Sequence, residues 1–435
     1  MRYLFRDADI ITLDENSAVP RSSSLVVNGP RIVYVGNEPP PIPFDRVIDC
    51  AGKIIMPGLV NAHTHTPMAL LRGMSDDCSL EDWLSRVIWP VESALTKGDI
   101  ACGTLLAAAE MLAYGTVSFS DMYRHSDTVA ETVATTKMKA NICESITNGE
   151  DSGIGRLERV RESIRMIDRW NGWGDGLIRC DTSIQSIFQT TPALWEFIAA
   201  LAGEKGVGVH IHLGETKDER ENCEKRYGKT PTRLLYDAGV LKNRVVAVHG
   251  TYLDGADIEI LAGCGAHIVH DPASNLKTCC ATARLKPFLD KGINVALGTD
   301  GVCSNNSGDL FATMRQTALL QKAFENDPAW MTANQTLRLA VAGGWASQGR
   351  AGESGVIAAG KDADLIILNG EHPGLWPNYD PVTTAVYAAQ GGHVETVMVR
   401  GEILYNKGEY LTIDMEKLRH DVSQFARKAR SRVWY

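Results

Sequence analysis

The sequence predicts an α/β fold: a TIM-like (β/α)8 barrel with a small β-sandwich domain formed from both chain ends. Three observations support this prediction. From Lys53 onward, short β-branched runs alternate with longer helical patterns. Both ends of the chain instead have the texture of strands joined by turns. The length of 435 residues suits a large barrel with a smaller attachment.

The N-terminal segment, residues 1–56, is expected to be the first part of the small β domain. Two β-rich runs flank Asn28-Gly29-Pro30, which is a turn signal. A proline cluster at 38–44 follows and suits an edge or a connection better than a helix. The segment therefore predicts short strands.

The barrel is predicted over residues 57–355, with the first strand beginning just before it. The eight candidate strands lie at residues 54–61, 116–120, 140–144, 177–181, 208–213, 245–250, 266–270 and 293–298. Between the first two, Thr96 and Asp99 form a capping-box pattern before an Ala/Leu-rich helix, which Gly115 can close. Eight strand–helix units are what a closed barrel requires.

The C-terminal segment, residues 356–435, returns to strands and turns and ends in a helix beginning near Met415. Neither end of the chain holds enough apolar residues for a core of its own. We therefore expect the two ends to pair into one small β domain with the barrel inserted between them. A separate domain at each end is the alternative.

Composition excludes several classes of function. Hydrophobic residues make up 44% and charged residues 22%, as in an ordinary soluble globular protein. The net charge of -9 argues against nucleic-acid binding. No apolar stretch approaches the ~18 residues of a membrane span, and charges interrupt the N-terminus before a signal peptide could form. The ten cysteines contain no C-x-x-C pair and indicate reduced thiols. We expect a cytoplasmic protein with a small-molecule substrate, no nucleic-acid partner and no membrane; a homo-oligomer is left open.

Histidines and carboxylates occupy the ends of several predicted strands. His63 and His65 end the first strand at positions i and i+2, so both imidazoles point to one face. The fifth strand ends in His210 and His212, with Glu215 three residues further on. One such pair alone could be chance. The sixth strand ends in His249 and the eighth in Asp300.

The carboxyl ends of all barrel strands meet on one face, so these side chains should converge. We predict that His63, His65, His212 and Asp300 bind one divalent metal ion, with His210 as the bystander. Three nitrogens and a carboxylate suit Zn2+, and Fe2+, Ni2+ or Mn2+ also fit these ligand types. The fourth strand offers no lysine to bridge two ions, which favours a mononuclear site.

The segments PGLVNAHTHTPMALLRG, HIHLGET, VHG, HDPASNLK and LGTDGVCSNNS resemble the amidohydrolase superfamily. More narrowly, the chain is similar to the 5-methylthioadenosine/S-adenosylhomocysteine deaminase and chlorohydrolase group over nearly its whole length. The resemblance implies that Glu215 shuttles a proton and that His249 polarises the attacking oxygen or the intermediate. It implies hydrolytic deamination of an amino-substituted heterocycle, first of all an adenosine-type nucleoside. Independently, the carboxylate of Asp300 can accept a proton from a water molecule activated by the metal.

The resemblance also implies substrate contacts. Trp83 matches an aromatic wall, Glu92 a ribose-binding carboxylate and Arg156 an arginine that grips an amino-acid carboxylate. Glu92 could instead be a solvated glutamate at a helix end, and Arg156 a surface charge on the following helix. Ser304, in the same motif as Asp300, is a further candidate. Gln185 stands where the deaminases carry a purine-contacting histidine.

A second departure is Glu144, which stands where some relatives carry an arginine and would repel a substrate carboxylate. A guanine or pterin deaminase and a triazine-type chlorohydrolase are therefore kept beside the adenosine-type interpretation. A catalytically inactive barrel that acts as a binding protein is the hypothesis from another class, although such relatives normally lose metal ligands. Every metal and proton-transfer position is filled in this chain.

Overall fold

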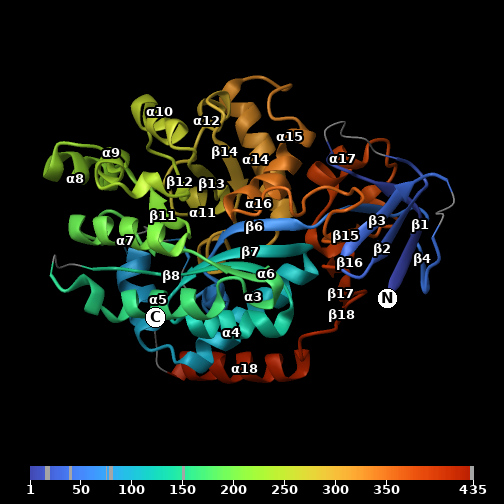
Figure 1. Cartoon of the computed structure of the whole chain (residues 1–435), viewed down its shortest axis with the longest axis horizontal. Coiled ribbons are helices and arrows are strands. Elements are labelled where there is room, and N and C mark those ends of the chain that lie inside the picture. Colours follow the sequence, from blue (N-terminus) through green and yellow to red (C-terminus); the bar gives the residue numbers. More distant parts are fainter. Residues whose placement is uncertain (15–19, 39–41, 75, 78–81, 149–151, 432–435) are drawn as a thin grey trace. The chain divides into compact units, whose positions relative to one another are not determined.

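The computed structural model describes residues 1–14, 20–38, 42–74, 76–77, 82–148 and 152–431. It confirms the predicted (β/α)8 barrel (Figure 1). The barrel strands are β6 (Leu59–Thr64), β7 (Thr116–Tyr123), β8 (Lys139–Glu144), β9 (Ile178–Cys180) with β10 (Thr182–Ile184), β11 (Val209–Leu213), β12 (Val245–His249), β13 (His267–His270) and β14 (Asn294–Leu297).

Hydrogen bonds join these strands into a ring. One sheet has the order β6-β7-β8-β9 and another the order β10-β11-β12-β13-β14. Asp181 links β9 to β10, and its amide donates to the carbonyl of Ile142 in β8 (3.0 Å). After β14, the amides of Thr299 and Asp300 donate to the carbonyl of His63 in β6 (3.2 and 3.0 Å). The last strand therefore meets the first.

The first predicted strand is two strands in the structure. Gly58 separates β5 (Ile54–Pro57), which pairs with β1 and β15, from the barrel strand β6. A Cβ at Gly58 would lie only 2.2 Å from Cγ1 of Val117, so a larger residue would collide with β7 here. The sequence pattern missed the break because both halves are continuously apolar.

Strands from both chain ends form one nine-stranded sheet with the order β18-β17-β16-β15-β5-β1-β2-β3, and β4 pairs with β1. Their bounds are β1 (Arg2–Ile10), β2 (Ser23–Asn28), β3 (Arg31–Gly36), β4 (Arg46–Asp49), β15 (Leu365–Leu368), β16 (Val394–Val399), β17 (Glu402–Asn406) and β18 (Glu409–Tyr410). Phe5 and Leu25 from the first end pack in one buried cluster with Leu365 and Met398 from the other. The two ends thus share a core.

Helices separate the barrel strands. The first, α3 (Lys97–Ala113), begins at the predicted capping box: the amide of Thr96 donates to Asp99 Oδ2 (2.9 Å), and the amide of Asp99 donates to Thr96 Oγ1 (3.2 Å). Further helices are α4 (Ser126–Thr136), α5 (Glu158–Trp170), α7 (Pro192–Lys205), α8 (Lys217–Tyr227), α9 (Pro231–Asp237), α10 (Gly255–Gly263), α14 (Leu310–Glu325) and α15 (Ala333–Arg338). The last helix, α18 (Met415–Ser431), begins where the sequence predicted it.

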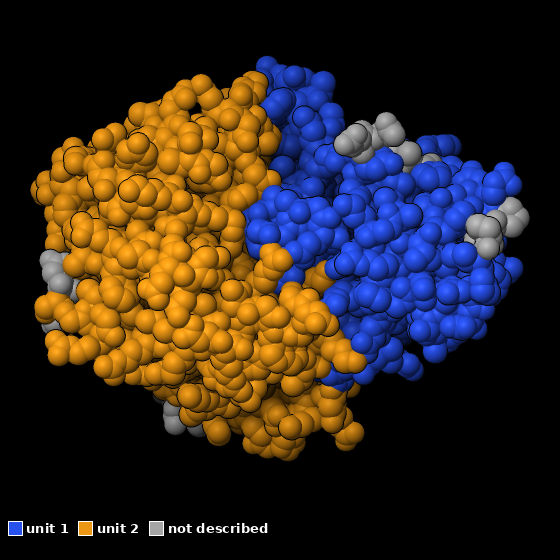
Figure 2. All heavy atoms as spheres, in the orientation of Figure 1, with its two compact units in different colours: residues 1–61, 109–118, 309–413 blue, residues 62–108, 119–308, 414–435 orange. Residues whose placement is uncertain are grey.

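The chain divides into two compact units (Figure 2). One comprises residues 1–61, 109–118 and 309–413 and contains the nine-stranded sheet. The other comprises residues 62–108, 119–308 and 414–435 and contains most of the barrel strands. Within the described residues, no helix is long and apolar enough to cross a membrane.

Candidate metal centre and active site

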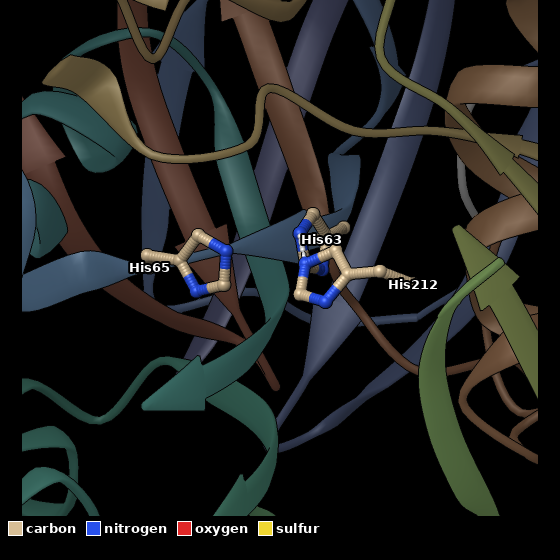
Figure 3. Close-up of side chains that lie close together, drawn as sticks. All are labelled: His63, His65 and His212. Carbon is tan, nitrogen blue, oxygen red and sulfur yellow. Dashed lines mark hydrogen bonds between the residues drawn. The ribbon is translucent and has the colours of Figure 1, made fainter. Parts of the chain in front are cut away.

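Three histidines predicted as metal ligands lie together at the carboxyl ends of the barrel strands. His63 is buried in β6, His65 follows this strand, and His212 lies in β11. One ring nitrogen of each lies within 4.8 Å of the corresponding nitrogen of the other two (Figure 3). The Nε2 atoms of His63 and His212 are 3.2 Å apart.

Hydrogen bonds on the far side of each ring leave the Nε2 atoms free to bind a metal ion. Nδ1 of His65 donates to the carbonyl of Met122 (2.5 Å), and Nδ1 of His212 donates to the carbonyl of Gln185 (2.7 Å). Nδ1 of His63 lies 2.9 Å from Nε2 of His210. Such outer partners fix the tautomer and orientation of metal-binding imidazoles. His210 therefore supports a candidate ligand.

Asp300 completes the cluster from the end of β14. Its Oδ1 lies 3.6 Å from Nε2 of His63 and 3.3 Å from Nε2 of His65. Its Oδ2 accepts hydrogen bonds from the hydroxyls of Ser274 (2.5 Å) and Ser304 (3.1 Å). The backbone of Asp300 has a φ of 57°, in the left-handed region that a non-glycine residue adopts at a cost.

The protonation states suit a cation at this place. Burial lowers the pKa of His63 well below its usual range and that of His212 to about 4, so both rings are neutral at pH 7. Burial acts to raise the pKa of Asp300, but the facing imidazoles lower it well below its ordinary value. Neutral histidines and an ionised carboxylate are the forms that bind a divalent metal. The four residues therefore fit such an ion.

Two further groups predicted to move protons lie beside this cluster. Nε2 of His249, at the end of β12, is 3.8 Å from Oε1 of Glu215. The side-chain amide of Asn275 donates to Nδ1 of His249 (3.1 Å), which leaves the ring hydrogen on Nε2. Burial lowers the pKa of His249 to about 4, so the ring is neutral at pH 7. Burial also raises the pKa of Glu215, which favours a carboxyl group able to hold a proton.

A cavity of about 520 Å³ opens over these residues. His65, His212, Glu215, His249 and Asp300 line it, whereas His63 lies behind them. Four candidates for substrate contact also line it: Trp83, Glu92, Gln185 and Ser304. The structure thus brings together residues that are more than 200 positions apart in the chain.

Arg156 lies apart from the other candidates. It is exposed in a short 3-10 helix and is absent from the described cavity lining, so its role stays a prediction. Arg159, three residues further on, does line the cavity. Nη1 of Arg159 donates to Oε1 of Glu144 (3.1 Å) and to the carbonyl of Ser145 (3.2 Å).

Glu144 differs from the expectation that it faces the substrate. Its side chain is 1% exposed, and it does not belong to the described cavity lining. The amide of Ser126 donates to its Oε2 (2.9 Å), and Arg159 binds its other oxygen. Burial raises the pKa of Glu144 to about 7. The carboxyl group therefore acts on the cavity through Arg159.

Sequence reasoning missed two residues at the end of β7. Tyr123 and Arg124 both line the cavity, and the hydroxyl of Tyr123 donates to Oε1 of Glu92 (2.5 Å). Polar residues at the end of a barrel strand are the signal on which the metal ligands were predicted, and it was present here too. It was overlooked because neither residue type is a usual metal ligand.

A (β/α)8 barrel with three histidines and an aspartate gathered at the carboxyl ends of its strands is the arrangement expected of a metal-dependent hydrolase. The chain matches the amidohydrolase family over residues 54–404, and it belongs to that family. The predicted family is therefore confirmed, and the chain is a hydrolase of carbon–nitrogen bonds with a site for a divalent metal ion.

Relatives resemble the chain over nearly its whole length. It is 37% identical over 431 residues to a 5-methylthioadenosine/S-adenosylhomocysteine deaminase from Acetivibrio thermocellus, covering 98% of this chain and 99% of that protein. It is 36% identical over 435 residues to a 5'-deoxyadenosine deaminase from Methanosarcina barkeri, covering 99% of each. A crystal structure of an adenosine deaminase from Xanthomonas campestris with bound zinc has a TM-score of 0.92 and 30% identity, covering 99% of this chain and 98% of that chain.

Proposed function

We propose that this protein deaminates an adenosine-type nucleoside, of the 5-methylthioadenosine or S-adenosylhomocysteine kind, by hydrolysis and with release of ammonia. The observation that carries the proposal is the position of Glu215 and His249 beside the histidine and aspartate cluster. They share one cavity with an aromatic side chain, Trp83, and a carboxylate, Glu92. The names of the relatives, which include deaminases of four adenosine-type compounds, support this substrate class.

His63, His65, His212 and Asp300 would hold one divalent ion, and we propose Zn2+, with Fe2+, Ni2+ and Mn2+ as the other ions that suit these ligands. Such an ion lowers the pKa of water from ~15.7 toward ~7 and so supplies a nucleophile at neutral pH. The zinc named in the Xanthomonas campestris structure supports this choice. Elemental analysis of protein purified without chelators tests it: one zinc per chain is expected.

The protein's own residues would then move the protons. Asp300 accepts a proton at a carboxylate oxygen, while its other contacts from Ser274 and Ser304 keep it oriented. Glu215, whose buried carboxyl group has a raised pKa, gives a proton to the departing nitrogen. His249 donates from Nε2 to the oxygen that develops on the attacked carbon. Each proton transfer of this kind contributes ~10²–10⁴-fold to the rate.

The cavity wall would bind the rest of the substrate. Trp83 packs against the apolar part, and Glu92, fixed by Tyr123, accepts hydrogen bonds from two vicinal hydroxyls. Gln185 contacts the heterocycle at the position where the resemblance expects a histidine. Ser304, whose hydroxyl donates to Oδ2 of Asp300, is a further substrate contact. Arg156 remains a prediction for a substrate carboxylate.

The rival reaction keeps the site but expels chloride, as a triazine-type chlorohydrolase would. Matched substrates decide between them: adenosine and its 6-chloro counterpart present the same sugar with different leaving groups. The proposal expects ammonia from the first at the higher kcat/KM. Chloride alone would contradict it, because Glu215 is placed to protonate an amine and chloride needs no proton.

The same assay, extended to free guanine and pterins, tests whether the substrate is a nucleoside. Ammonia released only from guanine or pterins would move the substrate class away from adenosine. No release from any amino-substituted heterocycle, together with absent metal, would favour the inactive binding protein.

The predicted division at residues 56 and 355, the cytoplasmic location and a homo-oligomer stay predictions. The nine cysteines that the structure describes are all free, as a reducing compartment would require. This supports the cytoplasmic location.

A further inference from the structure

Two arginines line the cavity, and their guanidinium groups differ in what they bind. Arg159 is already engaged, because Glu144 and the carbonyl of Ser145 accept its Nη1 hydrogens at 3.1 and 3.2 Å. Arg124 has no hydrogen bond or ion pair within the part of the chain that the structure describes, and its buried Nε lacks a partner. Among the described residues, one arginine of the cavity is therefore free to bind a ligand.

A half-buried guanidinium without a partner is costly, because water is excluded from at least one of its N–H groups. Arginine presents its donors in a planar fork that matches a carboxylate or a phosphate. A free fork on a cavity wall is therefore suited to an anionic group that arrives with the ligand. The described residues supply no such group of their own to Arg124.

The location of Arg124 indicates which part of the ligand it meets. It directly follows Tyr123, whose hydroxyl holds Glu92 at 2.5 Å. Glu92 is the residue proposed to bind the sugar hydroxyls. Arg124 therefore belongs to the same stretch of wall as the sugar-binding carboxylate, at the end of β7.

We propose that Arg124 determines specificity by binding an anionic group carried on the sugar side of the substrate, so that nucleosides bearing a carboxylate or a phosphate are preferred over neutral ones. This inference rests on the proposed function. Arg124, and not Glu144, is then the residue that determines whether the cavity attracts or repels a substrate carboxylate. A carboxylate and a phosphate are both oxyanions that Arg124 could bind, and one substrate carrying each group distinguishes between them.

Steady-state kinetics on three nucleosides test the proposal: neutral adenosine, S-adenosylhomocysteine with its carboxylate, and adenosine 5'-monophosphate with its phosphate. Ammonia release is measured for the wild type, Arg124→Gln, Arg124→Lys and the control Arg161→Gln. Arg161 is exposed on α5 and does not belong to the described cavity lining. The control removes the same charge without touching the cavity.

For Arg124→Gln we expect kcat/KM to fall roughly 10- to 100-fold on at least one anionic substrate, as for loss of a charged hydrogen bond. Adenosine should change by no more than about twofold. Arg124→Lys, which keeps the charge, should recover part of the loss, and Arg161→Gln should match the wild type. A loss confined to S-adenosylhomocysteine assigns a carboxylate, and a loss confined to the monophosphate assigns a phosphate.

An equal loss on all three substrates would overturn the proposal, since a merely structural role predicts it. A wild type without preference for either anion would overturn it as well. Calorimetric titration with the same three compounds needs no turnover. If no compound is deaminated, the proposed function fails, yet the ratio of anionic to neutral binding in wild type and Arg124→Gln still decides the role of Arg124.

Discussion

Replacing Tyr123 with phenylalanine removes one hydroxyl from the cavity wall and leaves the ring in place. The side chain is nearly buried, and its hydroxyl donates to Oε1 of Glu92 over 2.5 Å. Burial raises the pKa of Tyr123 well above its ordinary value, so the hydroxyl stays protonated throughout an assay range of about pH 6 to 9. A hydrogen bond to a charged group contributes about 1.5–3 kcal/mol. Losing it should lower kcat/KM roughly 10- to 100-fold for a substrate that Glu92 binds.

The assay compares adenosine with 2',3'-dideoxyadenosine in the wild type and Tyr123→Phe. If Tyr123 holds Glu92 against the sugar hydroxyls, the loss falls on adenosine, mainly in KM, and the dideoxy compound is unaffected. A thermal melt of both proteins serves as the control for folding. Equal losses on the two substrates would refute the reasoning, because the hydroxyl would then support the wall and not the diol contact.

Three further changes separate the roles in the site. His212→Ala should lose bound metal and activity together, as seen by elemental analysis beside ammonia release; full metal content would remove His212 from the ligands. Glu215→Gln should keep the metal but lose roughly 10²–10⁴-fold in kcat, and full turnover would exclude Glu215 from proton transfer. The pKa of Glu144 is about 7 in the folded protein, against about 4.3 for a free glutamate. The folded state therefore binds the proton of Glu144 more tightly than the unfolded state does. As a result, the contribution of Glu144 to the free energy of unfolding declines as the pH rises from about 4 to 7. In urea titrations, Glu144→Gln should lack that decline; an unchanged slope would contradict the assignment.

The clustering of the proposed metal ligands could be predicted from the sequence because their signal is periodic. His63 and His65 lie two residues apart at the end of a strand, which fixes both side chains on one face before any tertiary contact is known. The barrel then requires that Asp300, at the end of the eighth strand, reach the same place. In the structure, its Oδ1 lies 3.3 Å from Nε2 of His65. Strand order alone was enough to predict that these two residues lie on the same face of the barrel.

The substrate wall could not be predicted in the same way. Arg156 and Arg159 stand three residues apart in one motif, and only the turn geometry before α5 decides that Arg159 lines the cavity. The break at Gly58 depends on the close approach of Val117, a contact between strands far apart in the sequence. Turn geometry and contacts between distant strands leave no periodic signal in a single sequence, so neither feature could be predicted.

Gln185 and Glu144 looked like two unrelated departures from the family pattern, but the structure connects them. The hydroxyl of Ser145 donates to Oε1 of Gln185 (2.6 Å), and the carbonyl of Ser145 accepts from Arg159, which also binds Glu144. Gln185, Ser145, Arg159 and Glu144 thus form one hydrogen-bonded network, in which Ser145 connects Gln185 to Arg159.

Gln185→His should raise activity on adenosine-type substrates if the position faces the ring, but the new side chain would inherit Ser145 as its neighbour. We therefore expect its effect to depend on Glu144. In a double-mutant cycle with Glu144→Gln, the two changes should depart from additivity in kcat/KM by roughly 0.5–3 kcal/mol, as for residues in one hydrogen-bonded network. Additive effects would mean that Gln185 and Glu144 act independently, and that Gln185 alone sets the contact with the heterocycle.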